Sequence, residues 1–181
     1  MEPWRGKNWE KHGILILGES WYSDVVDLNE YVEKWAAGTL KDGDYLFSRL
    51  FNICMSDANQ HTSGASYETR KAFWDAIAFH NFIPWSIGKT NKERPKENKE
   101  QNDYERAACV FEKKLFELQP RRIWILGKTQ ARYSKPIVCK YKKSCECHYK
   151  ISFHPCYRRG ATTESLVKDW KECIGDIKLF S

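Results

Sequence analysis

The segment Gly13-Ile14-Leu15-Ile16-Leu17-Gly18 consists of four aliphatic residues with a glycine at each end. A short apolar run of this kind is typical of a strand that is buried on both faces, as in parallel sheets. Residues 76–82 and 123–127 form two further runs of the same character. The sequence therefore predicts a central sheet whose faces are both covered.

Segments with apolar residues at helical spacing lie between these runs. The clearest is 27–37, where apolar residues recur at i, i+3, i+4 and i+7 and Gly38 follows as a helix C-cap. Further helices are expected over residues 44–56, 67–74, 102–118 and 163–179, and further strands over 137–142 and 148–153. Alternating strands and helices predict a three-layer α/β/α fold with a mainly parallel sheet of four to five strands.

Length and composition fit one domain spanning residues 1–181. The chain has 181 residues, of which 41% are hydrophobic and 14% aromatic, enough for a real core and too many for a disordered chain. Residues 88–103 hold no apolar residue except Pro95, and we expect a mobile charged loop there. The longest aliphatic run has four residues, far short of the ~20 that a membrane span needs.

The basic residues are concentrated in one part of the sequence. The net charge is +6, and residues 121–160 carry eleven Lys or Arg but one acidic residue, Glu146. A basic block inside a folded domain points to a polyanionic partner, most often a nucleic acid. An ordinary solvated basic surface is the alternative.

Polar segments directly follow the predicted strands. They are residues 18–22, 80–82, 127–129 and 154–156. In open α/β sheets, ligands bind beyond the carboxyl ends of the strands, so these four segments are expected to converge on one crevice. Each segment taken alone could be an ordinary strand exit.

Two of these segments contain side chains suited to catalysis. Glu19 follows a buried strand, where a partly desolvated carboxylate can hold a water or face a developing cation. Its alternative role is to cap a helix. His154, which precedes Pro155, could donate a hydrogen bond to an anion, or it could be a satisfied core histidine.

The cysteines allow a different hypothesis. Cys139, Cys145, Cys147 and His148 fall within ten residues, and Cys156 is near, so this set could hold a structural zinc. The usual CxxC spacing is absent. A metal-stabilised interaction module is therefore one alternative, and free thiols are the other, since seven cysteines are an odd number in an apparently cytosolic chain.

Three common motifs of nucleotide-binding proteins and metalloproteases are absent from the sequence. The Gly-Lys-Thr triplets at 88–90 and 127–129 lack the second glycine, five positions earlier, that a phosphate-binding P-loop requires. No GxGxxG and no HExxH occurs. A nucleoside triphosphatase, a dinucleotide enzyme and an HExxH metalloprotease are therefore not expected.

In their order, the four strand exits resemble the uracil-DNA glycosylase superfamily. Gly18-Glu19-Ser20-Trp21-Tyr22 is similar to its first motif, which is GQDPY in the uracil-specific enzymes and GEAPG in the thermophile-type branch. Residues 80–82 stand where the family has an Asn-bearing strand end, residues 120–129 resemble its segment ending in LGxxA, and residues 153–156 resemble its HPS motif. The resemblance extends from Ile14 to about Trp170.

The resemblance implies a DNA glycosylase that hydrolyses the N-glycosidic bond of uracil or another modified pyrimidine flipped out of DNA, leaving an abasic site. Glu19 and His154 would be catalytic: Glu19 would position water or stabilise the sugar cation, and His154 would stabilise negative charge on base O2. The base would be bound by Ser20, Trp21, Tyr22, Asn81 and Phe82, with Phe79 as another stacking aromatic. The DNA would be bound by Lys128, Tyr157, Arg158 and Arg159.

The departures from the family pattern leave a second interpretation open. Ser20 stands in place of the aspartate of GQDPY, Trp21 in place of its proline, and Cys156 in place of the serine of HPS. These changes allow a catalytically inactive nucleic-acid-binding protein with the glycosylase fold. No cysteine precedes Cys54, so the family's iron–sulfur cluster is not implied.

The start of the sequence has no apolar segment typical of a secretory signal. We therefore expect the protein in the cytoplasm, with no membrane partner. The resemblance implies DNA as partner, association with the nucleoid, and a reaction that requires no cofactor and no metal. We also expect a monomer.

Overall fold

The computed structural model describes residues 1–20, 27–40, 45–56, 62–87, 97–156, 162–177 and 179, with the side chains of 97–102 left out. A five-stranded sheet has the order β1-β3-β2-β4-β5. Its strands are β1 Trp4–Arg5, β2 Ile14–Gly18, β3 Ala78–Asn81, β4 Arg122–Leu126 and β5 His148–Ser152. All neighbouring strands pair in parallel except the short β1, which is antiparallel to β3.

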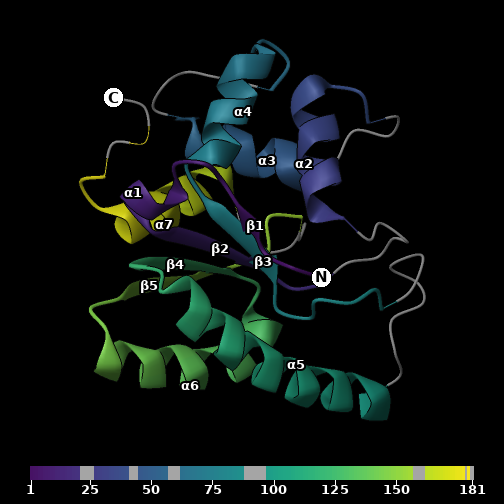
Figure 1. Ribbon diagram of the computed structural model, residues 1–181, viewed down its shortest axis with the longest axis vertical. Coiled ribbons are helices and arrows are strands. Elements are labelled where there is room, and N and C mark those ends of the chain that lie inside the picture. The colour runs from purple at the N-terminus through teal and green to yellow at the C-terminus, as the bar shows by residue number, and fades with distance from the viewer. Residues whose placement is uncertain are drawn as a thin grey trace.

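Helices cover both faces of the sheet, as predicted (Figure 1). The helices are α1 Trp9–His12, α2 Leu28–Ala37, α3 Tyr45–Cys54, α4 Tyr67–Asp75, α5 Glu97–Leu118, α6 Lys128–Ser144 and α7 Thr163–Ile174. Helices α2, α3, α4 and α7 lie on one face, and α5 and α6 lie on the other. The α/β/α fold class is therefore confirmed. Among the described residues, no helix has the length and apolar character that crossing a membrane requires.

Strand β2 is the centre of both cores. Ile14 and Ile16 pack against the α2–α4 and α7 side, while Leu15 and Leu17 pack against α5 and α6. All four side chains are completely buried. Because successive side chains of a strand point to opposite faces, four consecutive aliphatic residues fit only a strand covered on both sides.

Local sequence signals set several helix ends. The Asp27 carboxylate accepts a hydrogen bond from the Asn29 amide at 2.8 Å and so caps α2. At the other end of α2, Gly38 has a φ of 71°, in the left-handed region that glycine favours. Ser66 and Thr162 cap α4 and α7 in the same way as Asp27. The Asp27 cap explains why α2 begins at Leu28, within one residue of its predicted start.

The connections that follow β2 and its two neighbouring strands leave on opposite faces of the sheet. After β2 it passes into α2 on one face, whereas after β3 and β4 it passes into α5 and α6 on the other face. Strand β2 lies between β3 and β4 in the sheet. Neighbouring strands whose outgoing connections leave on opposite faces open a crevice at their carboxyl ends. By this rule we expect a crevice at the end of β2, where Glu19 begins the next segment.

Two predicted elements were wrong, and one predicted helix is shorter than expected. Residues 137–142, predicted as a strand, lie inside α6, because Ala131, Ser134, Val138 and Tyr141 are buried at helical spacing. Residues 97–103, predicted as loop, form the first turns of α5; the segment is rich in Glu, Lys and Gln, which form helices well without apolar periodicity. Residues 88–96 lie outside the described residues. Helix α7 ends at Ile174, short of the predicted 179.

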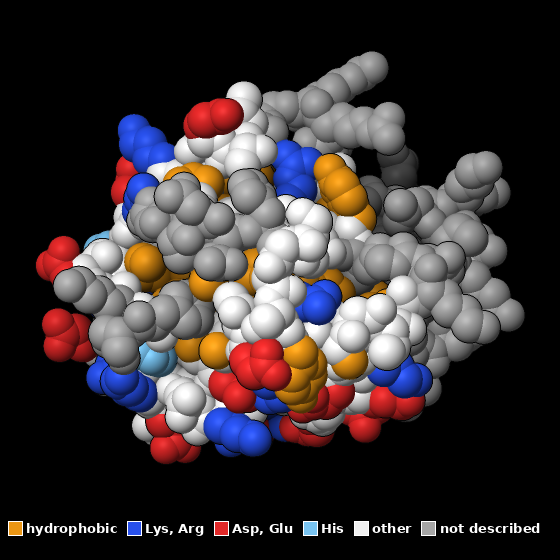
Figure 2. Space-filling view, turned by 90° about the horizontal axis from the view of Figure 1, so that it is seen from above, with side chains coloured by type: hydrophobic (Ala, Val, Ile, Leu, Met, Phe, Trp, Pro, Cys, Tyr) orange, Lys and Arg blue, Asp and Glu red, His pale blue; other side chains and the backbone are white. Residues whose placement is uncertain are grey.

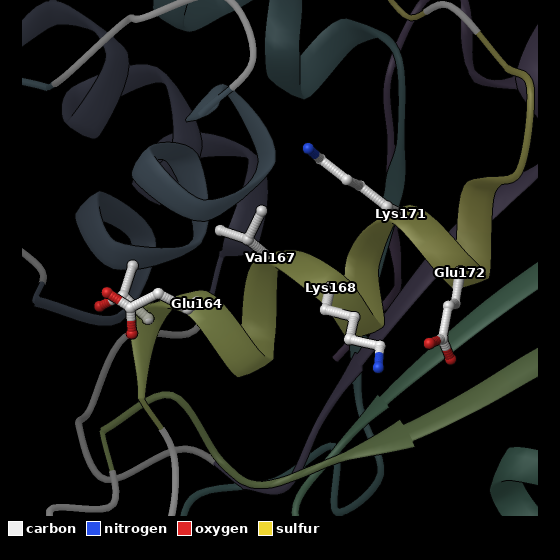
Figure 3. Close-up of a pocket in the computed structure, with 6 residues that line it drawn as sticks. Glu164, Val167, Lys168, Lys171 and Glu172 are labelled. Atoms are coloured by element: carbon white, nitrogen blue, oxygen red, sulfur yellow. The ribbon is translucent and has the colours of Figure 1, made fainter.

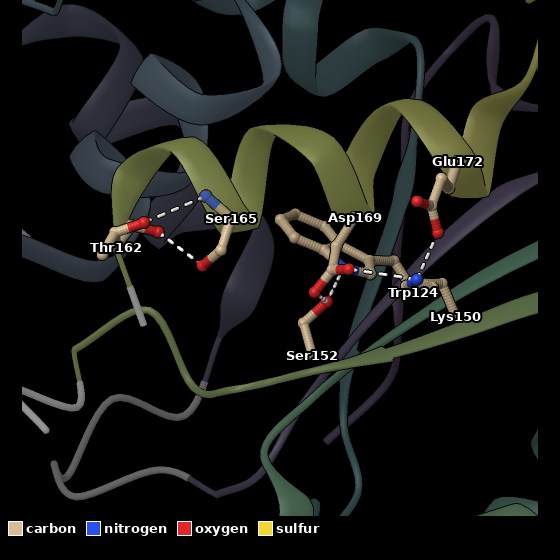
Figure 4. A network of polar contacts seen from close by, with 7 residues as sticks. All are labelled: Trp124, Lys150, Ser152, Thr162, Ser165, Asp169 and Glu172. Atoms are coloured by element: carbon tan, nitrogen blue, oxygen red, sulfur yellow. Dashed lines mark hydrogen bonds and ion pairs between the residues drawn. The ribbon is translucent and has the colours of Figure 1, made fainter. Parts of the chain in front are cut away.

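A polar network joins the far strands to α7 (Figure 4). The indole nitrogen of Trp124 donates to Ser152 Oγ at 2.7 Å, and Ser152 Oγ donates to Asp169 Oδ2 at 2.8 Å. Lys150 Nζ lies 3.1 Å from Asp169 Oδ1 and also pairs with Glu172. Ser152 is only 2% exposed and Trp124 is completely buried, so the Ser152 hydroxyl satisfies an indole donor that water could not easily reach.

We predict that Ser152→Ala lowers the free energy of unfolding by about 2 kcal/mol, since it leaves the Trp124 N–H buried without an acceptor. Ser134→Ala is the matched control, because Ser134 is equally buried but its hydroxyl has no hydrogen-bond partner. That control should be neutral or slightly stabilising. Urea denaturation measures both. Equal losses for the two variants would contradict the role given to the network.

Candidate functional site

The four polar segments lie at one edge of the sheet. Gly18 pairs with Asn81 at the ends of β2 and β3, and Leu126 pairs with Ser152 at the ends of β4 and β5. Glu19 and His154 therefore leave the same edge, from strands separated only by β4. At ~4.8 Å per strand spacing, the two strand ends are about 10 Å apart. The predicted convergence of the strand exits at this edge agrees with the parallel topology.

The Glu19 side chain is held from α5. Tyr104 Oη donates to Glu19 Oε1 at 2.5 Å, and the Glu19 carbonyl accepts from the Ile83 amide at 2.9 Å. The Tyr104 ring stacks on Tyr133 of α6, with centroids 4.7 Å apart and planes 8° apart. It also stacks on Phe82 at 6.2 Å. A half-buried carboxylate with one oxygen fixed by a rigid phenol is well suited to act in a defined direction.

Asn81 lies against the backbone of Gly18. A Cβ on Gly18 would come 2.3 Å from Asn81 Oδ1 and 3.1 Å from the Phe79 ring, so any larger residue at 18 would displace the amide. Asn81 is 2% exposed, and its Nδ2 is buried without a hydrogen-bond partner. The neighbouring Ser20 hydroxyl is also buried without a partner. Both groups thus retain hydrogen-bonding capacity that no described residue uses.

His154 has a defined orientation beside Gly127. Its Cβ lies 3.9 Å from the position a Cβ on Gly127 would take, and Gly127 itself has a φ of 113°. His154 Nδ1 accepts a hydrogen bond from the Cys156 amide at 3.2 Å. A neutral imidazole that accepts at Nδ1 carries its proton on Nε2. His154 is therefore arranged as a hydrogen-bond donor through Nε2.

Gln130 joins the ends of β2 and β4. Its Nε2 donates to the Leu17 carbonyl at 3.0 Å and to the Leu126 carbonyl at 2.5 Å. The side chain is fully buried, and its Oε1 has no partner. Gln130 thereby links the end of β2, which leads to Glu19, to the end of β4, which leads to α6.

Unpartnered buried polar atoms are concentrated at this edge. Of the ten such side-chain atoms in the described part of the chain, five belong to Ser20, His80, Asn81 and Gln130. A buried polar atom without a partner costs roughly 1–3 kcal/mol, and native proteins keep few of them. This concentration supports the carboxyl edge as the candidate site, because a bound ligand or water could supply the missing partners.

The aromatic residues assigned to base stacking need correction. Phe82 is completely buried between Tyr104 and Phe111, and Phe79 is completely buried against Phe47 and Trp74. Both rings belong to the cores, so neither has a face available to a base. The prediction for Trp21 lies outside the described residues, as do those for Tyr22, Tyr157, Arg158 and Arg159.

The basic block of residues 121–160 does not form one surface. Arg121 lies at the opposite edge of the sheet, where its guanidinium donates to the carbonyls of Glu10 and Lys11. Lys140 is paired with Glu112, and Lys150 is paired with Asp169 and Glu172. Lys128 lies at the carboxyl edge with its Nζ 3.8 Å from the centre of the Phe153 ring.

The cysteine-rich segment is not arranged as a metal centre. The described residues, which include every cysteine, contain no group of three or more His, Cys, Asp or Glu side chains placed to hold a metal ion. Cys139 Sγ instead contacts the Tyr149 hydroxyl at 3.4 Å, and Cys147 is buried. Burial raises the pKa of the Cys147 thiol to about 11, which keeps it protonated. All seven cysteines are free thiols, as expected.

Two residues of the site were missed by the sequence analysis. Tyr104 lies in the predicted helix 102–118, at helical spacing from the inward-facing Ala107 and Phe111 and at the end nearest the strand exits. That spacing could have identified it. Gln130 could not have been found this way, because a single glutamine early in a helix carries no periodic signal.

A shallow groove of about 500 Å³ runs along the exposed side of α7 (Figure 3). Its lining residues are Thr163, Glu164, Val167, Lys168, Lys171 and Glu172. Only α7 contributes these residues, and their charges are mixed. The groove contains none of the residues at the carboxyl edge, so it is separate from the candidate site.

Comparison with known proteins adds no relative: no protein-family model matches the chain, and no curated protein matches its sequence. The functional argument therefore rests on the residues and their geometry.

His80, next to Asn81 on β3, generates a prediction about pH. It is 1% exposed, and neither ring nitrogen has a hydrogen-bond partner among the described residues. Burial, with smaller contributions from the positive charges of the N-terminal ammonium and of Lys114, lowers the pKa of His80 from 6.5 to about 4. Between these values the unfolded chain binds a proton that the folded chain does not, so stability falls as the pH drops.

We expect His80 alone to make the protein about 2 kcal/mol less stable at pH 5 than at pH 7. His80→Leu removes the titrating group and should reduce the pH dependence of the unfolding free energy by that amount. Urea denaturation at the two pH values measures the difference. An unchanged pH dependence in the variant would show that His80 is protonated equally in both states.

Proposed function

We propose that this protein hydrolyses the N-glycosidic bond of uracil or another modified pyrimidine flipped out of DNA, leaving an abasic site. The observation that carries the proposal is that an oriented carboxylate, Glu19, and an oriented histidine, His154, follow strands at the same edge of a parallel sheet. The similarity of the strand-exit motifs to the uracil-DNA glycosylase superfamily supports the same reaction.

The chemistry requires charge stabilisation at both ends of the breaking bond. As the bond between C1′ and the base nitrogen breaks, its electron pair leaves with the base and the sugar becomes oxocarbenium-like. Water then gives its hydroxyl group to C1′ and its proton to the base. The Glu19 carboxylate would face the sugar cation and hold that water, while His154 Nε2–H would donate to base O2. Preorganised groups of this kind are worth ~3–4 kcal/mol each.

Asn81 would recognise the extruded base. Its unpartnered Nδ2 can donate to a carbonyl of a pyrimidine, and its position against Gly18 fixes the direction of that donor. Flipping a base out of the duplex costs a few kcal/mol, least for a mismatched or damaged base. Supplying partners to buried polar groups on binding would offset part of that cost.

We predict that the protein releases a free pyrimidine from DNA and that Glu19→Gln slows the release by about 100- to 1,000-fold. The substrates are single- and double-stranded oligonucleotides with uracil or modified cytosines, and mass spectrometry detects the released base. Glu10→Gln is the control, since Glu10 is exposed on α1 at the opposite edge of the sheet and should behave as the unsubstituted protein.

Failure to produce abasic sites on any of these DNAs, with folded protein, would contradict the enzymatic proposal. Salt-dependent DNA binding that survives Glu19→Gln, with no product in either case, would instead identify the inactive nucleic-acid-binding alternative suggested by Ser20 and Trp21.

Tyr104 is assigned as a positioning residue, because its hydroxyl orients Glu19. We expect Tyr104→Phe to lower kcat by about 10- to 100-fold with little change in KM, since the stacked ring remains and only the hydrogen bond is lost. Tyr133→Phe is the matched control in the same aromatic stack. Single-turnover and steady-state base-release assays measure the effects on kcat and KM separately. Equal effects of the two variants would assign Tyr104 a merely structural role.

A further inference from the structure

We infer that one flank of α6 carries the DNA backbone into the site, through the exposed side chains of Lys128, Arg132 and Lys135, which we call the α6 basic stripe. The identity of the polyanion as DNA rests on the proposed function. That the stripe binds an anion is argued from the spacing of its residues, from their lack of carboxylate partners among the described residues, and from their position beside the site.

The spacing of the three residues places them on one side of the helix. Positions i, i+4 and i+7 share a helix face, and seven residues of helix extend about 10.5 Å. At ~3.4 Å of rise per phosphate on one DNA strand, that length corresponds to about three phosphates. The stripe thus has the dimensions of a short backbone contact.

The charges of the stripe are not neutralised by the described part of the protein. No described carboxylate pairs with Lys128, Arg132 or Lys135, whereas Lys140 further along α6 is paired with Glu112. The first turn of α6 contains no acidic residue, so the positive end of the helix dipole adds to the same field. Three cations without a carboxylate partner among the described residues, together with a helix N-terminus, form an anion-attracting surface.

The stripe begins at the candidate site. Helix α6 starts directly after Gly127, which lies against His154, and the Lys128 ammonium lies over the Phe153 ring one residue before His154. From there the stripe runs along the outside of the α5–α6 layer. The opposite face, seen in Figure 2, carries basic and acidic side chains intermixed. DNA bound along α6 would therefore pass the carboxyl edge where an extruded base could enter.

The test compares two double variants on the same helix. Arg132→Ala with Lys135→Ala removes two charges of the stripe and leaves Lys128, beside the site, in place. Lys142→Ala with Lys143→Ala removes two exposed charges from the last turn of α6, at the far end of the helix. Binding of a 20-base-pair DNA duplex is measured by fluorescence anisotropy from 50 to 200 mM salt, and thermal unfolding verifies that both variants fold.

The stripe variant should bind about 10-fold more weakly near 100 mM salt, and the slope of log K against log salt should become shallower by about 1.8. The control should change the affinity by less than about 2-fold. Equal losses in both variants, or no loss in the stripe variant, would overturn the inference. Stripe-dependent binding by a protein that releases no base would uphold the inference while contradicting the proposed reaction.

Discussion

The pairing of β2 between β3 and β4 is the constraint on which the rest of the structure depends. Its four aliphatic side chains are buried in two separate cores, so the strand cannot shift by one residue without exchanging every contact on both faces. The parallel register then brings the carboxyl ends of neighbouring strands level. Glu19, Asn81, Gly127 and His154 meet at one edge because that register is fixed.

The arrangement at this edge differs from that of an ordinary strand exit. Packing alone would favour polar side chains that satisfy one another or face water, yet Ser20, Asn81 and Gln130 keep buried atoms without partners. Around them the fold supplies rigid supports: the aromatic stack that holds Glu19 and the backbone amide that sets the tautomer of His154. A rigid frame around unsatisfied polar groups is how a site preorganised for a ligand is built.

The sequence predicted the fold class because the buried strands and capped helices are local signals. Hydrophobic periodicity gave the wrong secondary structure in two places. Charged residues with high helix propensity extend α5 back to Glu97, and the burial of Val138 and Tyr141 at helical spacing places a strand-like run inside α6. At the site, the motifs located Glu19, Asn81 and His154, because strand ends are visible in sequence. Tyr104 and Gln130 act across long sequence separations, 85 and 113 residues from their partners, which no local pattern encodes. The basic residues 121–160 likewise do not form one surface, because Lys140 and Lys150 make ion pairs with acidic residues far away in the sequence.

In the proposed reaction, the Glu19 carboxylate and the His154 imidazole act on the same breaking bond. A double-mutant cycle on single-turnover base release, with Glu19→Gln, His154→Ala and the combined variant, tests it most directly. Groups that stabilise one transition state together give strongly non-additive losses, so the combined variant should be scarcely slower than the slower single variant. Losses that multiply independently, or an unsubstituted protein that releases no base, would contradict the account.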